Sequence, residues 1–237
     1  MAGKLKSISK RIHWSLVVKA GIFGAAWFST PFPLFLLVAA WLFFVPLFDP
    51  LRLFLQFAVV LVIAAFLPET AFSALFLATL FFLLLGIKEL VFINRRAAYE
   101  TFLFILLFVI FLNFFSHFTR FVDQSALFVA FALSLLSSIL LGGFVNYSGL
   151  GGANRKQKFF ALALAGLLLW QISAALLFLP LNFLYQTAIA FLVMAMLTEL
   201  LVDYFTRELV PARLMVYFSA FFVFLTFLLV SNQWGLS

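Results

Sequence analysis

The stretch AFSALFLATLFFLLLGIKELVFI, residues 71–93, decides the fold class of this chain. It contains no charged side chain from Ala71 to Ile87, and only Lys88 and Glu89 interrupt it near its end. A helix of this length, rising about 1.5 Å per residue, covers the roughly 30 Å of hydrocarbon in a bilayer. Strands of a membrane β-barrel are about ten residues long and alternate in polarity. The continuous run therefore predicts a transmembrane α-helix.

Similar apolar runs lie on both sides of this stretch. Together they predict an all-α, polytopic transmembrane bundle of about nine spanning helices, at approximately 14–28, 33–48, 51–67, 71–93, 99–118, 125–145, 159–179, 182–205 and 211–230. A helix satisfies its backbone hydrogen bonds internally, as hydrocarbon requires. The predicted organisation is a basic cytoplasmic N-terminal segment at 1–13, the bundle at 14–230 and a short uncharged tail at 231–237.

The composition also indicates a membrane protein. Hydrophobic residues make up 67% of the 237 residues and charged residues only 10%, whereas soluble domains have about 25% charged residues. The chain contains no cysteine, which excludes disulfides, thiolate metal sites and a cysteine nucleophile. No cofactor and no metal are expected. The net charge of +7 comes from short clusters between apolar runs, so topology explains it without a nucleic-acid partner.

The positions of the basic residues predict the orientation. With nine crossings and a cytoplasmic N-terminus, the C-terminus lies outside, and the outer links contain only Arg120. The inner side contains twelve basic residues: Lys4, Lys6, Lys10, Arg11, Arg52, Arg95, Arg96, Arg155, Lys156, Lys158, Arg207 and Arg213. This bias follows the positive-inside rule. It also favours a true crossing for 14–28, although that run is short and contains Lys19. A re-entrant hairpin over 33–67 preserves the same parity and stays open.

The links contain residues that suit helix ends. Ser29 and Thr30 precede Pro31 and predict an N-cap followed by a first-turn proline for the second span. Asn182 is the predicted cap of the eighth span, and Pro211 suits the first turn of the ninth.

The first candidate site is a buried polar network on the cytoplasmic side, formed by Lys88, Glu89, Glu199, Asp203 and Arg207. Glu199 and Asp203 are four residues apart and share one helix face, where two like charges repel. Arg207, four residues further on, is the predicted local partner of Asp203. Glu199 then needs a partner from another helix, and Lys88 at a similar depth is the predicted one. An ion-pair network that holds helices together is favoured over a proton or substrate site.

The second candidate is an outer polar pair, Asn113 and His117, which share a helix face near the aqueous surface with Ser116 nearby. A histidine beside a carboxamide can relay protons or contact a lipid head group. An interfacial histidine without a specific role is the simpler interpretation, which we favour.

The third candidate is the longest loop, in which Gly149, Gly151 and Gly152 precede Arg155 and Lys156. Glycines followed by basic residues suit a phosphate or a lipid head group, but the Gly-Lys-Ser/Thr ending of a P-loop is missing and no strand precedes the loop. A flexible link is the favoured interpretation.

Uncharged polar residues within the spans are expected to serve helix packing. Gln171, Gln186 and Thr187 are candidates for interhelical hydrogen bonds. The small residues Ser134, Ser137, Ser138, Ala161, Ala165 and Gly166 suit close approach of two helices.

Three classes of function stay open. We favour a membrane-embedded scaffold or partner-binding subunit, because polar groups at depth are scarce and the links are short, and we therefore expect no enzyme. A small transporter or channel for an apolar, lipid-like or small solute is the first alternative, and a lipid-processing enzyme at the cytoplasmic face is the second. The expected partners are the lipid bilayer and other membrane proteins. The expected location is a cell membrane, crossed several times, such as the bacterial inner membrane.

An ion pathway is not expected, because ionisable or strongly polar groups must follow one another at successive depths. Here the polar residues fall into an outer and an inner set. The outer set is Asn113, His117, Asn182 and Gln186, and the inner set is Gln56, Lys88, Glu89, Glu199 and Asp203.

Overall fold

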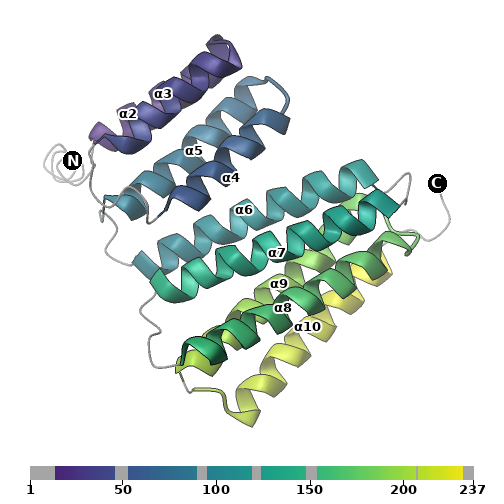
Figure 1. Ribbon diagram of the computed structural model, residues 1–237. Helices are drawn as coiled ribbons and strands as arrows, with labels where there is room; N and C mark the ends of the chain where they lie inside the picture. The colour runs from purple at the N-terminus through teal and green to yellow at the C-terminus, as the bar shows by residue number, and fades with distance from the viewer. Residues whose placement is uncertain are drawn as a thin grey trace, which may run out of the picture. The chain divides into compact units, whose positions relative to one another are not determined.

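The computed structural model describes residues 14–45, 53–89, 95–118, 124–147, 154–206 and 208–231 (Figure 1). Within these ranges all regular secondary structure is α-helical, in nine helices. They are α2 (Trp14–Ser29), α3 (Phe32–Phe44), α4 (Phe54–Phe66), α5 (Ala71–Lys88), α6 (Arg95–Phe118), α7 (Gln124–Tyr147), α8 (Arg155–Leu177), α9 (Phe183–Thr206) and α10 (Pro211–Ser231). Each corresponds to one of the nine predicted segments, so the all-helical fold class is confirmed.

Six of these helices, α5 to α10, are long and apolar enough to cross a membrane. The other three are apolar but shorter, with 16 residues in α2 and 13 each in α3 and α4. The described part of the chain therefore has the helices of a membrane-spanning bundle, as the composition indicates.

The helix ends confirm one predicted cap and correct another. Asn182 caps α9, since its Oδ1 accepts a hydrogen bond from the Leu184 amide at 3.2 Å. The predicted cap of α3 by Ser29 or Thr30 is wrong, because α3 begins after Pro31 without a side-chain cap. Both hydroxyls instead donate back to carbonyls of α2, Ser29 to Ala25 and Thr30 to Ala26, each at 2.6 Å. They stabilise the end of the preceding helix.

The chain divides into two compact units, Met1–Phe102 and Leu103–Ser237. In the first unit, α2 packs against α3 and α5, and α4 packs against the same two helices. At one end Trp27 Nε1 of α2 donates to the Ala64 carbonyl of α4 at 2.9 Å. At the other end Lys19 of α2 reaches Glu89 after α5. The four helices therefore run alternately up and down beside one another (Figure 1).

A chain of phenylalanine rings forms the core of this first unit. Phe23 stacks on Phe81 with ring centroids 4.0 Å apart and meets Phe35 edge-on at 5.1 Å. Phe43 stacks on Phe57 at 4.2 Å, and Phe57 lies 6.2 Å from Phe81. All five rings are buried and come from all four helices. The high phenylalanine content thus serves core packing here, through stacked and edge-on ring pairs.

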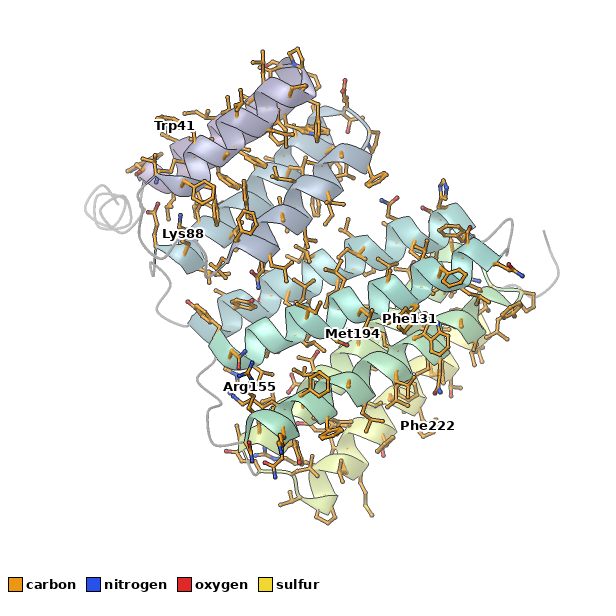
Figure 2. All side chains as sticks on the ribbon, in the orientation of Figure 1. Trp41, Lys88, Phe131, Arg155, Met194 and Phe222 are labelled. Carbon is orange, nitrogen blue, oxygen red and sulfur yellow. The ribbon has the colours of Figure 1, made fainter. Side chains whose placement is uncertain are left out.

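In the second unit, α9 is the central helix. It packs against α8 and α10, and its Phe191 ring meets two rings of α6, Phe104 at 5.8 Å and Phe108 at 5.5 Å. Met194, in the middle of α9, is fully buried (Figure 2). Contacts on several sides explain why α9 contains more buried residues than its neighbours.

Small residues let α7 and α8 approach closely. A Cβ added to Gly166 of α8 would lie 2.2 Å from Ser138 Oγ of α7, and one added to Gly142 of α7 would lie 3.1 Å from Leu162 of α8. Ser134 and Ser138 satisfy their hydroxyls on carbonyls one turn back in α7. This confirms that these serines and Gly166 serve helix packing.

Helix α10 differs from the other long helices, because none of its residues is buried. It packs along one side of α9. Its other sides present large apolar side chains such as Phe222, which points away from the neighbouring helices (Figure 2).

Candidate functional site

Asp203, near the end of α9, is a buried carboxylate with two side-chain partners among the residues that the structure describes. The residue is 5% exposed. Its Oδ2 accepts a hydrogen bond from the Tyr217 hydroxyl at 2.9 Å, and its Oδ1 lies 3.1 Å from Nη1 of Arg213. Arg213 also pairs with Glu208 at 2.8 Å. We refer to Asp203, Glu208, Arg213 and Tyr217 as the α9–α10 cluster.

The predicted partners of Asp203 and Glu199 have different outcomes. Arg207 lies outside the described residues, so its pairing with Asp203 stays a prediction. The observed partners of Asp203 come from α10. Glu199, half-buried one turn before Asp203, is close enough to Tyr217 to interact with it electrostatically. Lys88 belongs to the first unit and Glu199 to the second. Their pairing stays a prediction.

Lys88 and Glu89 take part in a separate cluster, at the end of the first unit where α3 ends (Figure 2). Lys88 Nζ donates to the Phe43 carbonyl and lies 4.2 Å from the centroid of the Phe43 ring. Lys19 Nζ pairs with Glu89 at 2.6 Å and donates to the Val45 carbonyl at 3.0 Å. We refer to Lys19, Lys88 and Glu89 as the α2–α5 cluster.

In both clusters, polar contacts join one helix to a neighbouring helix. The last carbonyls of a helix lack intrahelical donors and carry the negative end of its dipole, so two ammonium groups at the end of α3 satisfy carbonyls and oppose that charge. A buried carboxylate is costly unless it is paired and hydrogen-bonded, and Arg213 and Tyr217 supply these contacts to Asp203. The described contacts link α2 to α3 and α5, and α9 to α10.

The outer pair lies on an exposed part of α6. Asn113 and His117 are both exposed on that helix. The Asn113 carbonyl accepts the Ser116 hydroxyl at 2.9 Å, and the His117 ring meets Phe118 edge-on with centroids 5.2 Å apart. These contacts fit the interfacial histidine that we favour from the sequence.

The candidate loop is described only at its end, because Gly149, Gly151 and Gly152 lie outside the described residues. Arg155 and Lys156 are exposed in the first turn of α8. Asn154 caps this helix, and its own backbone N–H donates to Gln157 Oε1 at 3.3 Å, which completes a capping box. The Asn154 side chain thus accepts hydrogen bonds from backbone N–H groups in the first turn of α8, and this capping helps the helix to begin there.

The three residues predicted to form interhelical hydrogen bonds have different outcomes in the structure. Gln186 is buried and donates to the Leu176 carbonyl at the end of α8 at 2.7 Å, which confirms the predicted interhelical bond. Thr187 instead donates within α9, to Phe183 at 2.7 Å. Gln171 lies exposed on α8, and its side chain forms no hydrogen bond with any residue that the structure describes.

Sequence reasoning missed three of the groups that matter here. The sequence marks Lys19 only as a charge within a short span, and it does not assign Arg213 or Tyr217 to Asp203. An antiparallel hairpin offers a signal, because α10 folding back on α9 brings residues just after the link opposite those just before it. Arg213 and Tyr217 are also four residues apart and therefore share one face of α10.

Within the described ranges, no group of three His, Asp or Glu side chains is placed to hold a metal ion. Comparison of the chain with protein-family models, with curated proteins and with solved structures finds no match. The inferences below therefore rest on the residues themselves.

Proposed function

We propose that this chain is a membrane-embedded scaffold or partner-binding subunit. The observation that carries the proposal is that the ionisable groups described above form contacts between helices. Lys19 and Glu89, Lys88 and the Phe43 carbonyl, and Asp203 with Arg213 and Tyr217 each join different helices. A transport or catalytic group must instead be free to bind and release a proton or substrate.

The exposed surface of α10 supports a partner within the membrane. Most long apolar helices here bury a substantial face, whereas α10 buries no residue and exposes Phe222, Val223 and Phe227. We propose that this surface receives an apolar helix of a partner membrane protein. Aromatic side chains suit such a contact because they bury a large area with few rotatable bonds.

We further propose nine crossings, with the N-terminus in the cytoplasm and the C-terminus outside, in a bacterial inner membrane. The antiparallel arrangement of α2, α3 and α4 along α5 supports this, since helices that share the depth of a spanning helix share its environment. A 13-residue helix covers only about 20 Å. Link residues and local bilayer thinning can supply the remainder. The twelve-to-one distribution of basic residues supports the orientation.

The experiment that tests the proposed function measures flux and contacts in parallel. Purified protein in liposomes should show no conductance and no proton-coupled flux. In native membranes, a photo-crosslinking amino acid at exposed Val223 should form a discrete adduct with one membrane protein, whereas the same amino acid at buried Met194 should form none. A reproducible ion flux abolished by Glu199→Gln would overturn the proposal in favour of a transporter. If the amino acid at Val223 formed adducts with lipid alone, the proposal that α10 receives a partner helix would be wrong.

A further inference from the structure

Gln171 is an unusual residue on the surface of a membrane helix. It follows Phe159, where the apolar run of α8 begins, by twelve residues or about 18 Å, and it precedes Leu179 by eight residues or about 12 Å. Both distances place it within the hydrocarbon region rather than at its border. The side chain is exposed and has no hydrogen-bond partner among the described residues. An amide group in hydrocarbon is costly unless its donors and acceptor are satisfied.

The residues around Gln171 form a regular seam along α8. Phe160, Leu164, Leu167, Gln171, Ala174 and Phe178 follow one another at alternating spacings of four and three residues. This is the spacing that keeps one helix face against another in a left-handed coiled coil, and most membrane helix pairs use the same geometry. Phe160, Leu164, Leu167 and Phe178 are all exposed. A single polar residue in such a seam commonly specifies register and partner.

We propose that this seam is the dimer interface of the chain, and that its occupant is the same seam of a second copy. A two-fold axis along the membrane normal sets the two α8 helices parallel, so that each seam residue faces its own copy. A glutamine amide offers both a donor and an acceptor, and two of them facing each other satisfy one another by reciprocal hydrogen bonds. The self-complementary amide is the reason for choosing a second copy. The proposal is independent of the partner surface on α10.

The absence of cysteine from the chain allows a direct test with the full-length protein in native-like bilayers. Phe159 and Phe160 are adjacent and equally exposed, at 69% each, but only Phe160 lies on the seam. Leu167, 46% exposed, and Leu168, 38% exposed, form a second matched pair, with Leu167 on the seam. After mild oxidation, Phe160→Cys and Leu167→Cys should give disulfide-linked dimers. Phe159→Cys and Leu168→Cys should give several-fold less.

The amide itself is tested by the dissociation constant of the purified protein in detergent. Gln171→Leu should weaken dimerisation about three- to twentyfold, as expected for loss of a polar contact between membrane helices. Gln171→Asn, which keeps a shorter amide, should retain part of the affinity. If Gln171 merely faces lipid, the leucine variant should fold at least as well and self-associate unchanged. That result, or equal crosslinking within each matched pair, or a seam adduct with a different protein, would overturn the proposal.

Discussion

Asp203 shows how a carboxylate is kept inside an apolar bundle. Its two oxygens have different partners, with Tyr217 bound to one and Arg213 lying against the other. The Arg213 side chain is 48% exposed and is shared with Glu208, so water screens its charge. The Tyr217 hydroxyl is the less exposed donor and replaces a water molecule that the buried oxygen has lost. We therefore attribute most of the hydrogen-bond stabilisation to Tyr217.

Tyr217→Phe should lower the free energy of unfolding by about 1.5–3 kcal/mol, since it removes a hydrogen bond to a charged group while keeping the ring. Unfolding in detergent, followed by helical circular dichroism, measures this. Tyr204→Phe is the control, because Tyr204 lies on α9 beside the same cluster but is exposed. In the Asp203→Asn background the effect of Tyr217→Phe should shrink. Equal losses for the two tyrosine variants would contradict the role given to Tyr217.

At the scale of helices, α2 and α5 approach each other closely in the first unit. A Cβ on Gly24 would lie 2.9 Å from the Ala74 carbonyl oxygen and 3.0 Å from Ala78 Cβ. Neither atom can turn aside, since one is backbone and the other is attached directly to it. Gly21, on the same helix, has open space where its Cβ would lie. Two glycines three residues apart thus have different roles.

Gly24→Ala should destabilise the protein by about 1–3 kcal/mol, because α2 and α5 must separate to admit the methyl group. Gly21→Ala should leave stability unchanged or raise it by up to about 1 kcal/mol, because alanine favours the helix. Thermal unfolding of the two variants in the same detergent compares them. Equal stability would show that α2 does not pack on α5 as described.

At the scale of the whole molecule, the number of crossings decides which ends of the chain share a compartment. An odd number places the two termini on opposite sides, and any even number places them on the same side. The α2–α5 cluster bears on this count, because it ties the ends of α2 and α3 to the end of α5. Contacts of this kind between two short helices and a long apolar one support the proposal that α2 and α3 cross the membrane with α5.

The proposed nine crossings predict that a reporter active only in the cytoplasm is active when fused before Met1 and silent when fused after Ser237. A reporter active only outside should give the reverse pattern. Both fusions use the full chain, and an immunoblot controls for expression. Cytoplasmic activity at both termini would require an even number of crossings and would exclude the proposed topology.

The sequence by itself determined that the chain is helical and where its helices lie. Helix formation in hydrocarbon is local, since each apolar run must satisfy its own backbone. The predicted runs therefore match α2 to α10 within a few residues, except near 46–52 and 90–94, where predicted span ends lie outside the described residues. The role of Gln186 could also be anticipated, because a buried amide needs a partner and the end of the preceding helix supplies carbonyls.

Only the tertiary structure decided which polar groups meet. Lys19 and Glu89 are 70 residues apart, and the local sequence around either residue does not identify the other as its partner. The observed partners of Asp203, Arg213 and Tyr217, lie ten and fourteen residues further along the chain, on the next helix. Similarly, the hydroxyls of Ser29 and Thr30 donate to carbonyls at the end of α2 and do not cap the start of α3. The physical reason is that pairing depends on which helices are adjacent and in what register. That is set by the packing of many apolar side chains at once, such as the phenylalanine core of the first unit, and not by the spacing of the polar residues themselves.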